Sequence, residues 1–323
     1  MNIYQIAEKA GVSIATVSRV LNNSNKVSEK TREKVLRVIS EGNYRPNVFA
    51  RGLMIDSMKL VGVICTEVSD IFIAKALSFV QAQLYKRNYD TLLFCIGSHQ
   101  EATMKHLQYL QDKHVDAIFL IGSAFSDTIE KKELCALAQS VPVIMINGYV
   151  EADGIYSVYC DDSAAVEETV THFYENNLKN IAFLYDSMTQ STKRKIDGYR
   201  HGLEKNGLLF RKEQLIACDT NIESGYNAVK QLILGKAQID AVVASSDLLA
   251  VGAHKAFQER GITGAVVGCD NTVLCACTTP PLSSIDTRIL EMCETGVQIM
   301  DALFQHTAVK RVHVYRSKLI LRK

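Results

Sequence analysis

The chain contains 323 residues, enough for two or three domains of about 100–150 residues each. Its composition, 47% hydrophobic and 22% charged, excludes a chain that is disordered throughout, and no apolar run reaches the ~18 residues that a membrane span needs. The net charge of +1 is unevenly distributed, because residues 1–60 carry ten basic and five acidic side chains, whereas the remainder has an acidic excess. A basic N-terminal segment indicates an anionic partner, and nucleic acid is the first candidate.

The first residues contain neither a basic nor an apolar region of the kind that forms a signal peptide, which argues against a secreted binding protein. The nine cysteines are scattered and odd in number, a pattern that favours reduced thiols over a disulfide framework. We therefore expect a cytoplasmic protein, associated with the nucleoid if it binds DNA, with no membrane partner.

The N-terminal segment predicts two short helices joined by a tight turn. Asn2 and Gln5 have the spacing of a capping box at the start of the first helix, and Gly11 breaks it. Ser13 can then cap a second helix over residues 14–21. Two helices joined by a glycine-containing turn of this length form a helix-turn-helix, although a small structural three-helix bundle would show the same spacing.

A third helix completes the predicted head, residues 1–46. Ser28 can cap this helix, and Gly42 ends it. Pro46 separates the head from residues 47–58, which are too few to form a stable helix in isolation but can fold when docked. We expect this segment to be a hinge helix followed by a linker.

From residue 59 onward, short apolar runs alternate with amphipathic stretches in two successive series. The expected strands cover residues 61–65, 91–96, 117–121, 143–147, 157–159, 181–185, 215–217, 241–245 and 266–269, and the expected helices cover 74–86, 101–113, 128–138, 194–206, 223–234 and 248–260. Alternating strands and helices predict an α/β fold with doubly wound parallel sheets, here in two subdomains. Ligands of such folds bind beyond the carboxyl ends of the strands, so two facing sheets predict a cleft.

No motif for catalysis or for a cofactor is present. No two glycines are separated by a single residue, so the dinucleotide-binding fingerprint is missing, and HExxH, CxxC and GxSxG do not occur. Cys275 and Cys277 lack the second ligand pair of a metal site, and Asp161 and Asp162 follow a short strand, a position that favours a helix cap over an acidic pair. We expect no catalytic residue, no metal and no cofactor, and an α/β enzyme is the least favoured alternative.

Several segments resemble the lactose/galactose repressor (LacI/GalR) family. The dense matches are IYQIAEKAGVS (residues 3–13), ATVSRVLN (15–22), VSEKTREKV (27–35), NYRPN (43–47) and ARGL (50–53), and looser ones follow at 115–118, 198–199, 246–252, 267–271 and 281–285. The resemblance spans the chain and implies a homodimeric transcriptional regulator, most often a repressor. Such a regulator binds a palindromic operator in double-stranded DNA and a sugar or sugar derivative in a core like that of periplasmic binding proteins.

The resemblance also implies how the core is divided. The effector-binding and dimerisation core would cover residues 59–323, with the chain crossing between subdomains near 158, 286 and 314. The N-subdomain would contain about 59–157 plus 287–313, and the C-subdomain about 158–286 plus 314–323. No leucine-heptad tail precedes Lys323, so the tetramer-forming extension of some relatives is not expected.

The resemblance assigns DNA contacts to the second helix and to the hinge. Ile14 and Ala15 occupy the specificity positions in the major groove, where apolar side chains can contact a thymine methyl but cannot donate two hydrogen bonds. Arg19 can donate to a guanine edge, or alternatively to a phosphate. Leu53 matches the hinge leucine that opens the central base step, and Met54 stands where several relatives have a basic residue. The other expected DNA contacts are Tyr4, Thr16, Ser18, Asn22, Asn47 and Ala50.

The resemblance assigns effector binding to five positions of the core. Asp270 can accept two sugar hydroxyls, and Ser246 stands where many relatives have Asn. Lys195 replaces a common Arg and suits an anionic effector such as a sugar acid or phosphate, unless this basic run is only a solvated helix start. Phe72 matches an aromatic wall, whereas Thr220 stands where an aromatic residue is frequent.

Two questions about regulation remain open at the level of sequence. The stretch Ile14-Ala15-Thr16 is similar to that of relatives that act in carbon catabolite control, so a regulator gated by a protein partner is the alternative to a ligand-responsive repressor. The sign of the effector is also open, because a ligand shifts a conformational equilibrium only by its differential affinity for the two states.

Overall fold

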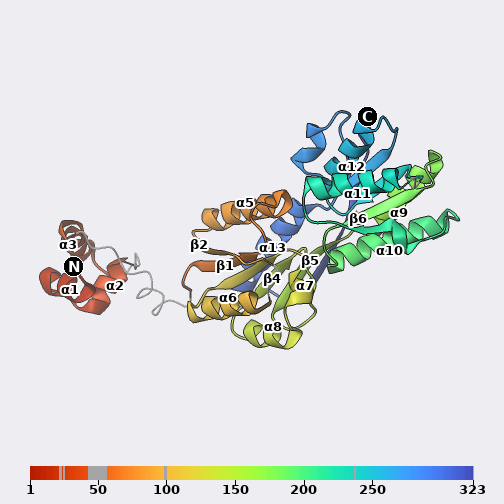
Figure 1. The fold of residues 1–323 in the computed structure, drawn as a ribbon. Helices are drawn as coiled ribbons and strands as arrows, with labels where there is room; N and C mark the ends of the chain where they lie inside the picture. Colours follow the sequence, from red (N-terminus) through yellow and green to blue (C-terminus); the bar gives the residue numbers. More distant parts are fainter. Residues whose placement is uncertain (22–23, 25, 43–56, 98–99, 236–237, 323) are drawn as a thin grey trace. The chain divides into compact units, whose positions relative to one another are not determined.

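The structure is a computed structural model that describes residues 1–21, 24, 26–42, 57–97, 100–235 and 238–322 (Figure 1). The chain divides into two units, Met1–Lys59 and Leu60–Lys323. Five of the expected DNA contacts lie outside the described residues, namely Asn22 and the hinge positions Asn47, Ala50, Leu53 and Met54.

The N-terminal unit contains three helices, α1 (Ile3–Ala10), α2 (Ile14–Leu21) and α3 (Glu29–Glu41). One small core joins them, and its buried members are Ile6, Ala7, Ala10, Val17, Val20 and Val35. The predicted helix-turn-helix is therefore present as a packed three-helix head.

The predicted caps of these helices can be compared with the structure one by one. The capping box of α1 is confirmed, because Gln5 N donates to Asn2 Oδ1 over 3.0 Å and Asn2 N donates to Gln5 Oε1 over 2.9 Å. Ser13 Oγ accepts from Thr16 N over 3.2 Å, as expected for α2. The expectation for Ser28 is wrong in part: it occupies the N-cap position of α3, but its hydroxyl pairs with that of Thr31 and caps no backbone N–H.

The first sheet of the core unit has the strand order β11-β5-β4-β3-β1-β2, and every pairing is parallel. Its strands are β1 (Leu60–Cys65), β2 (Asp90–Cys95), β3 (Ala117–Ile121), β4 (Val143–Ile146), β5 (Ile155–Asp161) and β11 (Val312–Arg316). Helices α5 (Ile71–Lys86) and α13 (Ile289–Phe304) pack together on one face, and α6 (Gln100–Asp112), α7 (Phe125–Thr128) and α8 (Lys131–Ala138) lie on the other (Figure 1). Each face thus buries its own apolar core.

The second sheet has the order β12-β10-β9-β8-β6-β7 and is parallel except for its edge strand β12. Its strands are β6 (Ile181–Tyr185), β7 (Leu215–Ala217), β8 (Ala241–Ala244), β9 (Ala265–Cys269), β10 (Ser283–Asp286) and β12 (Lys318–Ile320). The helices are α9 (Ser163–Glu175) and α10 (Gln190–Lys205) on one face and α11 (Ile222–Leu234) and α12 (Asp247–Glu259) on the other, with the short 3₁₀ helices η1 (Lys212–Gln214) and η2 (Val273–Cys277). The predicted α/β core with two doubly wound sheets is confirmed.

The chain passes from one sheet to the other three times: after β5, between β10 and α13, and after β11. Val158 pairs with His313, and Val314 pairs with Tyr159, so the expected crossing points at 158 and 314 lie within strands of the first sheet. The chain therefore leaves that sheet slightly later than expected, after Asp161 and Arg316.

Helix starts account for the main local differences from the predicted elements. The helix expected from residue 74 begins at Ile71, because Asp70 Oδ1 accepts from Phe72 N over 2.8 Å. The helix expected from residue 194 begins at Gln190, with Thr189 as its cap. The single helix expected over 128–138 is two helices, α7 and α8. Among the described residues, no helix is both long enough and apolar enough to cross a membrane.

Candidate functional site

The exposed side of α2 is the first candidate surface. Val17 and Val20 point into the head's core, which turns Ile14, Ala15 and Arg19 outward at the start and middle of the same helix. Ile14 is 36% exposed at the start of the helix. The arrangement matches a helix that presents its N-terminal half to a partner.

The other described head residues flank this surface. Tyr4 is 67% exposed near the start of α1. Thr16 and Ser18 are half-buried, and the hydroxyl of Thr16 is paired with that of Ser13 over 2.9 Å. Basic side chains are exposed on all three helices and next to them, at Lys9, Arg19, Lys26, Lys30, Lys34 and Arg37. The head therefore offers a cationic surface for an anionic partner.

The second candidate site lies in the core unit, at the carboxyl ends of strands from both sheets. Parallel strands end at a common edge of their sheet, so the residues that follow them are brought together even when they are distant in sequence. The polar residues in these positions are Asp70 after β1, Asp161 and Asp162 at the end of β5, Asp186 after β6, Ser245 and Ser246 after β8, and Asp270 after β9. We call Asp70, Asp162, Asp186, Lys195 and Asp270 the inner cluster.

Lys195, on α10, is the cation of the inner cluster. It is only 5% exposed, and its Nζ donates to the backbone carbonyl of Ser245 over 2.9 Å. Burial opposes its charge, but acidic neighbours outweigh burial and raise the pKa of Lys195 above its ordinary value. These neighbours are the carboxyl groups of Asp162, Asp270 and Asp186, because burial raises the pKa of the Cys269 thiol and keeps it neutral. Lys195 is therefore part of a buried polar site, and the alternative of a solvated helix start is wrong for this residue.

Asp270 follows β9 with a left-handed backbone, at φ 96°. Its N–H donates to the carbonyl of Ile285 over 2.8 Å, which anchors the turn to β10. Burial raises the pKa of the Asp270 carboxyl well above its ordinary value; Lys195 opposes this shift, and Asp247, Asp70 and Asp162 add to it. The carboxyl is thus held where its charge is poorly solvated, a property typical of binding sites.

Asp162 is a site residue that the sequence analysis interpreted differently. It stands at the N-cap position of α9, but it makes no side-chain cap; instead, Asp161 Oδ1 accepts from Ser163 N over 3.1 Å. Asp162 is 1% exposed, its Oδ2 accepts from the hydroxyl of Ser191 over 3.0 Å, and its Oδ1 has no partner. A buried carboxylate oxygen without a donor is costly, which marks this position as one that a ligand can satisfy.

The five expected effector positions differ in their surroundings. Lys195 and Asp270 are electrostatic neighbours, and Ser246, whose buried Oγ also lacks a partner, follows the residue to which Lys195 donates. Phe72, by contrast, is 8% exposed and packs into the core between the first sheet, α5 and α13. Thr220 is exposed between β7 and α11, and no described hydrogen bond connects it to the other four.

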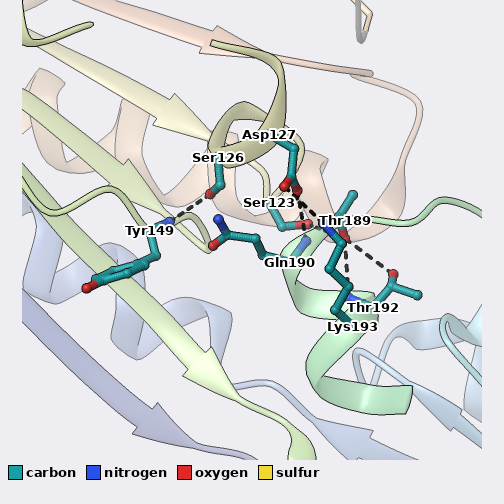
Figure 2. Close-up of polar contacts among 8 residues, drawn as sticks. All are labelled: Ser123, Ser126, Asp127, Tyr149, Thr189, Gln190, Thr192 and Lys193. Carbon is teal, nitrogen blue, oxygen red and sulfur yellow. Dashed lines mark hydrogen bonds and ion pairs between the residues drawn. The ribbon is translucent and has the colours of Figure 1, made fainter. Parts of the chain in front are cut away.

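A second set of polar contacts connects the two halves of the core directly (Figure 2). Asp127, after β3, accepts from Gln190 N over 3.0 Å and pairs with Lys193 Nζ over 3.2 Å, both at the start of α10. Ser123 Oγ donates to Thr189 Oγ1 over 3.0 Å. We call these five residues the latch. Its partners are more than 60 residues apart in the sequence, and no local pattern could have paired them.

Neighbouring contacts hold the latch in place. Ser126 Oγ accepts from Tyr149 N over 2.8 Å, which ties the segment after β3 to the segment after β4 (Figure 2). The guanidinium carbon of Arg194 lies 4.8 Å from the ring centre of Tyr159 on β5. The start of α10 is thus attached to the first sheet by hydrogen bonds, an ion pair and a cation–π contact.

Comparison with known proteins shows relatives along the whole chain. Residues 58–304 match the family described as periplasmic binding proteins and sugar binding domain of LacI family, and residues 2–47 match the bacterial regulatory proteins of the lacI family. An HTH-type transcriptional regulator of Lachnoclostridium phytofermentans is 36% identical over 329 residues, which cover 100% of this chain and 99% of that protein. Catabolite control protein A of Priestia megaterium is 31% identical, over 93% of this chain and 91% of its own length.

Solved structures also match the fold of this chain. The crystal structure of the lac repressor dimer bound to operator and the anti-inducer ONPF superposes with a TM-score of 0.86 at 25% identity, covering 100% of this chain and 98% of the other. The helix-turn-helix head and the two-sheet core are therefore both matched, in sequence and in structure. The chain belongs to the LacI family of bacterial regulatory proteins.

Proposed function

We propose that this protein is a sequence-specific DNA-binding transcriptional repressor, active as a homodimer in the cytoplasm. Its affinity for a palindromic operator is switched by a sugar-like small molecule bound between the two sheets of the core. The observation that carries this proposal is a pair of buried side-chain oxygens without partners, Asp162 Oδ1 at the end of β5 in the first sheet and Ser246 Oγ after β8 in the second. A purely structural core would satisfy such atoms internally.

In this proposal the head recognises the operator through α2. Ile14 and Ala15 contact thymine methyl groups, Arg19 donates to a guanine edge, and Tyr4, Thr16, Ser18 and Asn22 contact phosphates or base edges. Leu53 wedges into the minor groove, and Asn47, Ala50 and Met54 are further expected DNA contacts of the hinge. The exposure of Tyr4, Ile14, Ala15 and Arg19 supports the head contacts.

The core would act as the sensor. Asp270, Ser246 and Lys195 contact the ligand, whereas wall positions for Phe72 and Thr220 are implied by the family resemblance alone. The latch connects the two halves of the core, so a ligand that prefers one arrangement of the halves shifts the protein toward it. Such a shift changes the affinity of the dimer for its operator, and reciprocity requires the operator to change the ligand affinity by the same factor.

The operator-recognition step can be tested with the full chain on an operator selected from a random DNA pool. We expect Arg19→Ala to weaken operator binding by about 10–100-fold, because a bidentate contact to guanine supplies ~1–3 kcal/mol of discrimination. Binding to random DNA should change much less. The matched control is Arg37→Ala, an exposed arginine on α3, which should weaken binding to both DNAs by a similar small factor. Equal losses on both DNAs for Arg19→Ala would show that Arg19 contacts only phosphate.

The sensor step can be tested by measuring operator affinity with candidate small molecules. A compound that changes operator affinity in the wild type and not in Asp270→Ala supports the cleft as the sensor. Operator binding that appears only when a second protein is added would instead favour a regulator gated by a protein partner.

A further inference from the structure

We propose that Cys65 and Cys95 form a modification site, at which a hydroperoxide oxidises the two thiols to a disulfide within the chain. The site lies where β1 and β2 end, at the carboxyl edge of the first sheet. The inference goes beyond the proposed function, because it concerns a reaction of two side chains of the core and needs neither DNA nor an effector.

The two cysteines are direct neighbours in the first sheet. Strands β1 and β2 run parallel, in a register that pairs Cys65 with Cys95. Side chains of paired residues point to the same face of a sheet, and adjacent strands lie about 4.8 Å apart. Disulfides join Cα atoms that are about 4.4–6.8 Å apart, so this register brings the pair within range. In the part of the chain that the structure describes, no other strand pairing joins two cysteines.

A hydrogen bond holds the Cys95 thiol toward β1. Its Sγ donates to the carbonyl of Thr66, the residue after Cys65, over 3.3 Å. Backbone donors reach the same segment, because Gly97 N donates to the Thr66 carbonyl over 2.9 Å and Ile96 N donates to the Cys65 carbonyl over 3.1 Å. The strand ends are therefore joined without the thiol, and Cys95 can give up its hydrogen bond while β1 and β2 stay paired.

Burial gives the two thiols different roles. Cys95 is exposed, whereas Cys65 is buried in the apolar core on the α5 face of the first sheet. Burial raises the pKa of the Cys65 thiol to about 12, and the neighbouring Cys95 adds to this shift. Cys65 therefore stays protonated and sheltered, and Cys95 is the thiol that an oxidant in solution meets first. An accessible thiol next to a second, resolving thiol is typical of reversible oxidation sites.

The reaction balances with one molecule of hydrogen peroxide. The Cys95 sulfur attacks a peroxide oxygen, the O–O bond breaks, and a sulfenic acid forms while the second oxygen leaves as water with the thiol proton. The Cys65 sulfur then attacks the Cys95 sulfur, so that the S–S bond forms and the S–O bond breaks. The hydroxyl leaves as a second water with the proton of Cys65. The two thiols lose two electrons in total, the peroxide gains them, and a thiol reductant reverses the modification by exchange.

The first test maps the oxidation products of the full chain. The protein is reduced, freed of reductant, treated with hydrogen peroxide, alkylated and digested without reduction for mass spectrometry. We expect a peptide pair linked between Cys65 and Cys95, lighter by two hydrogen atoms than the separate peptides and released by dithiothreitol. Linkage between the Cys95 residues of two copies would overturn the inference. So would oxidation of Cys95 to the sulfinic or sulfonic acid with Cys65 still open to alkylation.

The second test uses variants of each thiol. Cys95→Ser alters only an exposed side chain, and we expect Cys65 to remain unlinked after peroxide treatment. In Cys65→Ala the sulfenic acid of Cys95 has no resolving thiol, so dimedone should label it more strongly than in the wild type. Equal dimedone labelling would refute the role of Cys65. If Cys65→Ala does not fold, Cys95→Ser and the map of the wild type still decide.

The matched control is Cys277→Ser. Cys277 is also exposed and also has a buried cysteine nearby in the sequence, Cys275, but the two lie on η2 and are not paired across strands. We expect this variant to form the Cys65–Cys95 linkage to the same extent as the wild type. Loss of the linkage in Cys277→Ser would show that the disulfide does not form directly between the neighbouring strands, and would overturn the inference.

Discussion

The latch and the inner cluster both involve α10, yet their environments are opposite. In the latch, the side chains of Lys193 and Asp127 are 52% and 32% exposed. Both carboxylate oxygens of Asp127 accept a hydrogen bond. In the inner cluster, Lys195 and Asp162 are at most 5% exposed, and Asp162 Oδ1 has no hydrogen-bond partner. Exposed ion pairs contribute little because water competes for them, whereas buried charges are expensive to leave unpaired. The comparison therefore predicts that removing a charge costs more stability in the inner cluster than in the latch.

The largest expected difference in stability between the two sets follows from removing one lysine from each. Lys195→Met leaves buried carboxyl groups without their cation, so we expect the free energy of unfolding to fall by about 3–5 kcal/mol. Lys193→Met, two residues earlier on the same helix, should cost less than about 1 kcal/mol. Urea unfolding at pH 7 measures both. Equal costs would mean that the two sets do not differ in the way that their burial indicates.

A smaller loss of stability is expected when α10, which carries residues of both sets, is pushed away from α9. Gly198 lets α10 approach α9 closely, because an added Cβ would lie 2.1 Å from the carbonyl oxygen of Ser163. Gly198→Ala should therefore cost about 1–3 kcal/mol by overpacking. The control is Gly235→Ala at the end of α11, where the nearest atom to an added Cβ is 3.3 Å away. Similar stability of both variants in urea would argue against close packing of α9 and α10.

The dependence of stability on pH distinguishes the inner cluster in another way. The folded-state pKa of Asp270 is raised, so between its ordinary value of 3.8 and the raised value the native state binds more protons than the unfolded state. Stability must then fall as pH rises through this window. Asp270→Asn removes this pH dependence, so the stability of the variant relative to the wild type should increase as pH rises through that window. A difference that is constant with pH would contradict the raised pKa.

The smallest expected effect concerns the latch ion pair. Asp127→Asn retains an acceptor for Gln190 N and loses only the pairing with Lys193. We expect a cost below about 1 kcal/mol, which should shrink further in 1 M salt because screening is strong there. Unfolding measured at low and at high salt tests this. A salt-independent loss above about 2 kcal/mol would show that the latch carries more of the stability than its exposure indicates.

Much of the fold follows from local sequence patterns. Strands β3, β6 and β7 begin and end at the predicted residues, because a short apolar run between polar segments has few alternatives. Helix α2 also has the predicted bounds. The helix α13 was not predicted, although it packs on α5 and closes one face of the first sheet. Its residues are apolar, but nothing local shows that they return to a sheet begun more than 200 residues earlier.

By itself, the sequence determined the helix-turn-helix head, the two series of strands and helices, and the family, because each depends on residues close together in the chain. Only the tertiary structure decided that Lys195 is buried beside Asp162 and Asp270, and that Asp127 meets Lys193. The sequence predicts a sugar or sugar derivative and shows Lys195, but not the carboxyl groups around Lys195, because these come from separate strands. Charge balance in a buried site is a property of spatial neighbours, and parallel sheets draw those neighbours from distant parts of the chain.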